Sequence, residues 1–157
     1  MPRRVQTGYE SMNTPAPFDK VFLEEALRSV FAEWVRLLDL RVLAARPGEV
    51  VLALPVTATH VHAGNVVSGQ TLMAAADTAM VLAVMSSLGA FRPMTTVQLN
   101  TSFLRPVAAD AGHARVTATV LRMGKSLVFG EVHIHTHDAK RGEDVLAAQA
   151  TTTYALL

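Results

Sequence analysis

The sequence predicts a single α+β domain in which one antiparallel sheet wraps around a long apolar helix. The segment from Gly69 to Ala90 has the length of a helix, and Asp77 is its only charged residue. β-prone segments lie on both sides of it, separated by glycine, proline and polar turns. Helices do not alternate with strands along the chain, which argues against a doubly wound parallel sheet. The 157 residues suffice for one domain with a continuous core.

The N-terminal region divides into a tail and a helix. Residues 1–17 lack hydrophobic periodicity and end in two prolines, so we expect a flexible tail followed by one domain over residues 18–157. The arginines at positions 3 and 4 precede no apolar stretch, so we expect no secretory signal in this segment. From Asp19 to about Leu38, apolar residues recur at helical spacing with charged residues between them. This pattern predicts an amphipathic helix.

A hairpin is predicted next. The β-prone runs Leu40–Ala45 and Val50–Val56 flank the sequence Arg-Pro-Gly-Glu, in which the Pro-Gly pair is typical of a turn.

The long apolar segment has the start and stop signals of a helix. Ser68 is in the N-cap position and Gly89 follows the last apolar turn. The segment is apolar nearly all round, so other parts of the protein must cover it. A central aspartate costs roughly 2.5–3.5 kcal/mol in a bilayer, which favours a buried helix over a membrane span.

The remainder of the chain predicts four strands. Turn residues separate them, which indicates an antiparallel meander. The expected strands are Thr95–Leu104, Ala114–Met123, Ser126–Thr136 and Val145–Leu156.

Charge and cysteine content exclude several function classes. The net charge of +1 provides no field for nucleic acid or an anionic membrane. The absence of cysteine excludes cysteine nucleophiles and cysteine zinc sites, and it is compatible with a cytoplasmic protein. His133, His135 and His137 share one strand face, and a His-x-His pair can ligate zinc. The sequence identifies no deprotonated residue that would complete such a site, so we expect no metal. Three aromatic residues are assigned to the core: Trp34, Phe103 and Phe129.

The start of the apolar helix is the richest site for chemistry. Gly69 lies in the first turn, where backbone N–H groups lack intrahelical partners and the helix dipole is positive. A developing oxyanion would be stabilised there. Asp77 follows eight residues later inside the same helix.

The stretch Ser68–Ala79 resembles the signature of hotdog-fold acyl-CoA thioesterases of the phenylacetate-degradation (PaaI-like) family. That signature is usually His-Gly-Gly, six further residues and an acid; Gly69 matches the first glycine and Asp77 the acid. The similarity continues through 95–106, which ends in Arg-Pro, and through the glycine-basic turn in 120–126, so about two-thirds of the chain is involved. This chain departs from the signature at three positions. Ser68 stands where the family usually has histidine, and Gln70 stands where it has the second glycine. His62, six residues before Ser68, stands where the family commonly has Asn or Gln.

The resemblance implies a hotdog fold and hydrolysis of an acyl-CoA thioester. Asp77 would act as nucleophile or general base, while the N–H at Gly69 would polarise the carbonyl. His62 and Ser68, at the altered positions of the pocket, are the other two candidate catalytic residues. The resemblance also implies that three residues lie near the coenzyme A part of the substrate: Arg105, Gly124 and Lys125. Because coenzyme A belongs to the substrate, we expect no separate cofactor.

The spacing of the two central residues requires more than one chain. Gly69 and Asp77 lie about 12 Å apart along a helix, at 1.5 Å per residue, so one reacting carbon cannot contact both. We therefore expect a homodimer or homotetramer with sites at the subunit interface.

Two alternatives remain open. A non-catalytic acyl-CoA binding or sensing protein would explain the missing histidine, and a hotdog hydratase or dehydratase would use His62 with an acid. The acyl group is not predicted.

Overall fold

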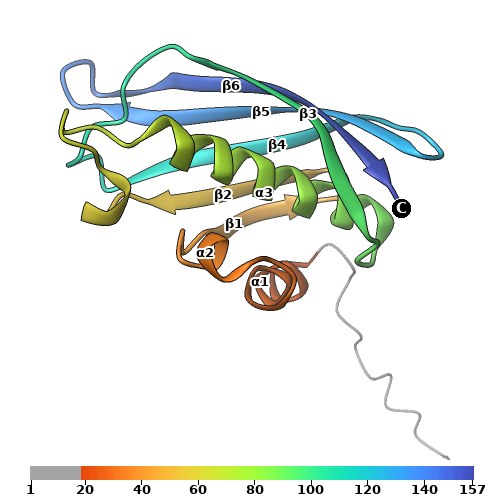
Figure 1. Cartoon of the computed structure of the whole chain (residues 1–157). Helices are drawn as coiled ribbons and strands as arrows, with labels where there is room; N and C mark the ends of the chain where they lie inside the picture. The colour runs from red at the N-terminus through yellow and green to blue at the C-terminus, as the bar shows by residue number, and fades with distance from the viewer. Residues whose placement is uncertain (1–18) are drawn as a thin grey trace, which may run out of the picture.

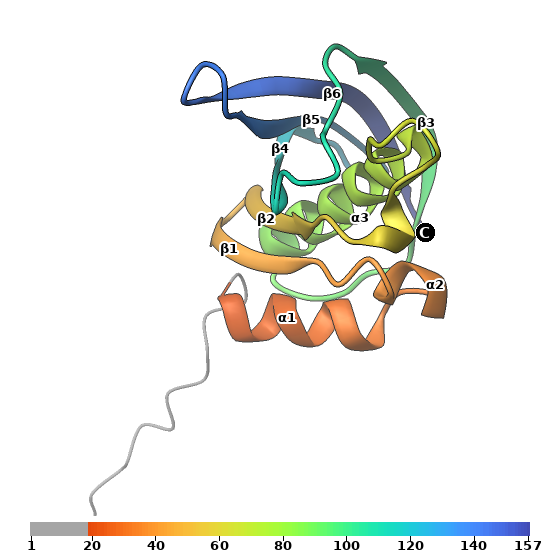
Figure 2. The ribbon, with the colours of Figure 1, turned by 90° about the vertical axis from the view of Figure 1, so that its left-hand side faces the viewer.

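Six antiparallel strands form one curved sheet around a central helix (Figures 1 and 2). A computed structural model describes residues 19–157, so the expected tail over residues 1–17 lies outside it. The strand order is β1-β2-β4-β5-β6-β3. The strands are β1 (Arg41–Arg46), β2 (Glu49–Pro55), β3 (Met94–Phe103), β4 (His113–Met123), β5 (Leu127–Asp138) and β6 (Glu143–Leu156). The α+β hotdog architecture is confirmed.

The central helix α3 (Gly69–Leu88) begins and ends where the sequence predicts. The Ser68 side chain accepts a hydrogen bond from the Thr71 N–H, and Gly89 ends the helix in the left-handed conformation. Most of the α3 residues are buried beneath the sheet, as an all-round apolar helix requires. Figure 2 shows α3 inside the curve of the sheet.

Alternation along the strands separates the covered face of the sheet from the open face. In β5, buried Val128, Val132 and Ile134 alternate with His133 and His135, which lie on the other face. Gly130 is one of the buried positions, and it has no room for a side chain. A Cβ there would be 2.2 Å from Cε of Met80 on α3 and 2.9 Å from the Thr119 carbonyl oxygen. This glycine therefore allows α3 to approach the sheet closely.

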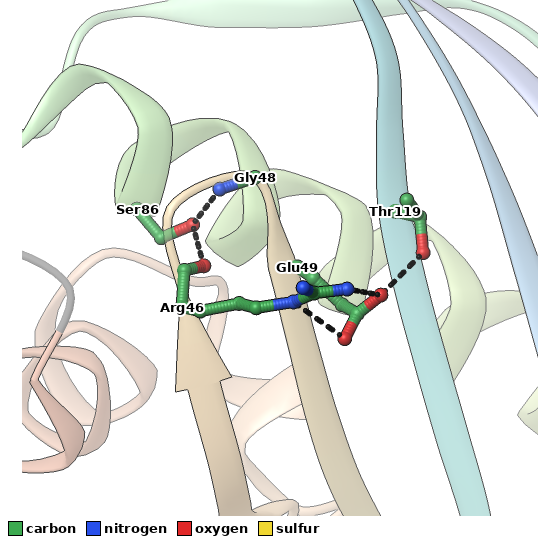
Figure 3. Close-up of polar contacts among 5 residues, drawn as sticks. All are labelled: Arg46, Gly48, Glu49, Ser86 and Thr119. Atoms are coloured by element: carbon green, nitrogen blue, oxygen red, sulfur yellow. Dashed lines mark hydrogen bonds and ion pairs between the residues drawn. The ribbon is translucent and has the colours of Figure 1, made fainter.

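The predicted β1–β2 hairpin is confirmed and is anchored to α3 (Figure 3). Ser86 of α3 is buried; its hydroxyl accepts from the Gly48 N–H at 3.0 Å and contacts the Arg46 carbonyl at 3.2 Å. Gly48 has φ +81°, which favours glycine. Glu49 accepts from the Arg46 guanidinium at 3.0 Å and from the Thr119 hydroxyl at 3.3 Å. The hydrogen bond from Arg46 holds the pKa of the Glu49 carboxyl below its usual value.

The single helix expected over residues 19–38 is wrong. The chain forms α1 (Lys20–Ser29) and a short α2 (Glu33–Arg36), because Ala32 takes an extended conformation between them. Both pieces place apolar side chains against the core, so the helical periodicity continues across the break. Trp34 is 60% exposed, in contrast to its predicted core position.

The predicted four-strand meander is only partly correct. Strands β4, β5 and β6 follow one another, but β3 pairs with β6 at the edge of the sheet and β4 pairs with β2. The segment after β3 crosses the end of the sheet, where the N–H groups of Leu104 and Arg105 donate to the Ala147 carbonyl. This crossover allows the sheet to cover α3 from both sides.

The two edges of the sheet differ. At β1, the Val42 N–H donates to the Glu24 carboxylate of α1 at 2.7 Å, and α1 lies alongside the strand (Figure 2). Among residues 19–157, β6 is the sole strand paired with β3. The β3 edge is therefore the open one.

Candidate functional site

The N-terminus of α3 forms the first part of the candidate site. Ser68 caps the helix: its hydroxyl lies 3.3 Å from the Thr71 N–H and 2.8 Å from the Thr71 hydroxyl. Gly69 is half-buried in the first turn, where N–H groups have no intrahelical acceptors. The structure thus assigns the Ser68 side chain a capping contact and presents the helix N-terminus at Gly69.

The aromatic ring of Phe103 lies over Gly69. A Cβ at Gly69 would be 3.2 Å from Cζ of this ring, which is tighter than an ordinary contact. The Phe103 side chain is 50% exposed and lines a hollow of about 380 Å³ together with Gly69, Leu72 and Arg105. The predicted core position of Phe103 is wrong, because the open β3 edge leaves its ring partly uncovered. The predicted core position of Phe129 is also wrong: its side chain is 41% exposed, because it lies on the uncovered face of β5.

Asp77 forms the second part of the candidate site. It lies half-buried in the middle of α3. Its Oδ1 accepts a hydrogen bond from the Thr96 hydroxyl at 2.9 Å and a second one from the Tyr154 hydroxyl. The Tyr154 hydroxyl also lies 2.8 Å from the main-chain carbonyl oxygen of Asp77. Burial, followed by the Asp77 charge and hydrogen bond, raises the pKa of Tyr154 well above its usual value.

One chain does not bring Gly69 and Asp77 together. They belong to the same helix, about 12 Å apart along its axis at 1.5 Å per residue. Strand β3 returns antiparallel beside α3, with its first residues near Asp77 and its last residue near Gly69. Both parts of the candidate site therefore border the open edge of the sheet.

His62 lies in the loop before α3. Its ring Nδ1 accepts from the Gly64 N–H at 2.9 Å, and its main-chain N–H donates to the Val66 carbonyl at 3.1 Å. Asn65 completes this turn with φ +63°. Within residues 19–157, the hydrogen bonds of His62 all remain in this loop, and none reaches Asp77.

The three residues expected near coenzyme A lie at two different ends of the sheet. Arg105 follows β3, lines the hollow beside Gly69 and donates to the Leu146 carbonyl at 3.0 Å. Gly124 and the exposed Lys125 form the β4–β5 turn, where a Cβ at Gly124 would be 2.6 Å from the Leu127 carbonyl oxygen. Seven residues of β5 separate these ends, or roughly 23 Å at 3.3 Å per residue. Arg105 and Lys125 of one chain therefore do not share a phosphate.

The histidines of β5 lie on the open face of the sheet. His137 contacts Asp144 at 3.2 Å, and Asp144 also pairs with Arg115 at 3.1 Å. Burial and the charge of Arg115 lower the pKa of His135. Over residues 19–157, no three His, Asp or Glu side chains converge to hold a metal ion.

Sequence reasoning missed Thr96 and Tyr154. Thr96 is 19 residues from Asp77 and Tyr154 is 77 residues away. They are register partners on β3 and β6, so the pairing of these strands places both hydroxyls beside one carboxylate. Their relation becomes visible only once this pairing is known.

The fold and site together define a hotdog protein with an anchored acid and a helix N-terminus beside an open sheet edge. The sequence model of the thioesterase superfamily matches residues 59–143. A relative from Thermoplasma volcanium named "Putative esterase TV1331" is 32% identical over 111 residues, covering 71% of this chain and 77% of the relative.

Solved structures give the same assignment. Zebrafish thioesterase superfamily member 2 is 25% identical, with TM-score 0.74, covering 88% of this chain and 98% of that chain. A mutant of the phenylacetic acid degradation protein PaaI from Thermus thermophilus is 26% identical, with TM-score 0.67, covering 80% of this chain and all of that chain. The chain belongs to the thioesterase superfamily. This membership supports thioester hydrolysis as its general activity.

Proposed function

We propose that this protein hydrolyses an acyl-CoA thioester to a free carboxylic acid and coenzyme A. The observation that carries the proposal is the anchored carboxylate of Asp77. Its Oδ1 accepts two hydroxyl hydrogen bonds, whereas its Oδ2 has no hydrogen-bond partner within residues 19–157. A carboxylate held by one oxygen, with the other open, suits a general base or a nucleophile.

The site is completed by a second copy of the chain. If two β3 edges pair antiparallel about a twofold axis, the end of one β3 lies opposite the start of the other. Gly69 of one copy, which lies beside the end of β3, then approaches Asp77 of the other. This arrangement removes the 12 Å separation that prevents one chain from forming the site. We therefore propose a homodimer, or a homotetramer built from such dimers.

The reaction then follows from the two groups. The N–H groups at the first turn of α3 in one copy polarise the thioester carbonyl and stabilise the developing oxyanion. Asp77 of the other copy either takes a proton from the attacking water, or attacks the carbonyl itself to form an anhydride that water then hydrolyses. In both routes the carbon–sulfur bond breaks, the coenzyme A sulfur takes up a proton that comes from the water, and the acyl group leaves as the carboxylic acid.

The same symmetry provides a place for the phosphates of coenzyme A. Arg105 lies at the end of β3, and Lys125 lies at the end of the sheet where β3 begins. Antiparallel pairing of two β3 edges brings Arg105 of one copy to the same end as Lys125 of the other. We propose that these two cations bind the coenzyme A phosphates and that Gly124 shapes the turn that presents Lys125. We propose the cytoplasm as the compartment, with which the cysteine-free composition is compatible.

A non-catalytic acyl-CoA sensor is the second candidate. The observation that favours it is Ser68, whose hydroxyl is engaged in capping α3 at the position where the resembling family usually has histidine. A hydratase reading loses support, because His62 makes its hydrogen bonds inside its own loop.

One experiment separates the candidates. Short-chain, long-chain and aryl acyl-CoA thioesters are assayed for released thiol, with binding measured in parallel by calorimetry. We expect release from at least one thioester and loss of release in Asp77→Asn. Binding of a thioester without thiol release supports the sensor.

A further inference from the structure

Tyr154 is the largest fully buried side chain of the domain, with 1% of its surface exposed. A buried phenol requires a hydrogen-bond partner, because an unpaired hydroxyl in an apolar core is costly. Both acceptors of this hydroxyl belong to Asp77: the carboxylate Oδ1 and the main-chain carbonyl. Strand β6 thus places a tyrosine under the one acidic residue of α3.

The contact fixes which oxygen of Asp77 is free. Thr96 and Tyr154 are paired across β3 and β6, and both hydroxyls donate to Oδ1. Thr96 approaches from the exposed side, whereas Tyr154 approaches from the core. With Oδ1 held from both sides, Oδ2 is the carboxylate oxygen that keeps no hydrogen bond within residues 19–157.

Tyr154 is also a constant donor. Its pKa is raised by burial and by the adjacent Asp77 charge, so the phenol keeps its proton over the range in which enzymes are assayed. It therefore donates to Asp77 without titrating itself.

We propose that Tyr154 is a positioning residue for the thioesterase reaction. Its hydroxyl fixes the rotamer of Asp77 through their hydrogen bond, while making no contact with substrate. The catalytic meaning of this assignment rests on the proposed function, but the hydrogen bond itself can be tested without turnover.

The test compares two variants that each remove one buried hydroxyl from β6. Tyr154→Phe keeps the ring and removes the donor to Asp77. Thr152→Val is the matched control, because Thr152 is 3% exposed and its hydroxyl donates to the Gln98 carbonyl at 2.9 Å. Both variants lose a buried hydrogen bond, but only one of these bonds involves Asp77.

For Tyr154→Phe we expect kcat to fall by about ten-fold or more, with KM within about two-fold of wild type, because a hydrogen bond to a charged group is lost. Thr152→Val should retain the wild-type kcat and KM. A wild-type kcat in Tyr154→Phe, or the same loss of kcat in Thr152→Val, overturns the proposal.

A second readout does not depend on activity. The Cγ chemical shift of Asp77 in ¹³C-aspartate-labelled protein, assigned by its loss in Asp77→Asn, is compared between wild type and the two variants at one pH. This signal should move in Tyr154→Phe, because a hydrogen-bond donor to the carboxylate is lost, and should remain at the wild-type position in Thr152→Val. If wild type binds but does not hydrolyse thioesters and this shift occurs, the proposed function fails while the anchoring of Asp77 stands. Absence of the shift refutes the anchoring, whatever the activity.

Discussion

Replacing Asp77 with asparagine isolates the charge from the geometry of the site. Asparagine has the shape of aspartate and retains an oxygen that can accept from the Thr96 and Tyr154 hydroxyls. The hydrogen bonds weaken because the acceptor is no longer charged, but burial of a charge is also avoided. We expect a folded oligomer whose stability changes by only about 1 kcal/mol.

Activity should respond far more strongly than stability. An amide cannot take a proton from water or attack a thioester, so kcat should fall by at least about 10², within the range for a lost general base. Binding of acyl-CoA should remain close to wild type, because the amide leaves the pocket shape intact. Alanine is the poorer test, since it removes the volume of the side chain and leaves the buried Tyr154 hydroxyl with only the main-chain carbonyl of residue 77 as its acceptor.

The assay measures released thiol and acyl-CoA binding on the same protein preparation, with light scattering to verify the oligomer. Full turnover by folded Asp77→Asn would refute the assignment of Asp77 as base or nucleophile.

Three further changes test other parts of the account. Replacing Arg105 and Lys125 together with alanine should raise KM for acyl-CoA and leave KM for a minimal thioester without the nucleotide nearly unchanged; equal effects on both substrates would contradict phosphate binding. Gly130→Ala should lower stability by about 1–3 kcal/mol, because the new Cβ collides with Met80 and with the neighbouring strand, and a thermal melt equal to wild type would refute this contact. The hydrogen bond from the Arg46 guanidinium lowers the pKa of Glu49 in the folded protein. The ionised Glu49 side chain therefore stabilises the fold at pH values above its pKa in the unfolded chain, and this stabilisation is lost as pH falls through its pKa in the folded protein. Urea titrations between pH 7 and pH 3 should therefore show a smaller acid-induced loss in Glu49→Gln, and the same loss as in wild type would contradict it.

Local signals in the sequence predicted the elements that depend on local physics. Ser68 and Gly89 mark both ends of α3 because a cap and a left-handed glycine act within one turn. The β1–β2 hairpin was equally predictable from its Pro-Gly turn. The break at Ala32 was not, since the apolar period continues across it and no glycine or proline marks it.

Long-range features could not be predicted from the chain alone. The position of β3 at the sheet edge follows from its pairing with β6, a choice that turn residues do not encode. This pairing determines that Phe103 is half-exposed and that Thr96 and Tyr154 meet Asp77. The family motif indicated Gly69 and Asp77, but the residues that surround them required the fold.

The central claim is that each site takes Gly69 from one copy of the chain and Asp77 from another. It is tested by co-expressing Asp77→Asn and Gly69→Val chains with different affinity tags and isolating the mixed dimers. Each variant alone is expected to be inactive. Asp77→Asn lacks the base or nucleophile, and in Gly69→Val the new side chain meets the Phe103 ring at the start of the helix. In a mixed dimer both defects fall in one site and the other site is intact, so about half of the wild-type activity per dimer should return. Mixed dimers that form but remain as inactive as either parent would contradict the shared site.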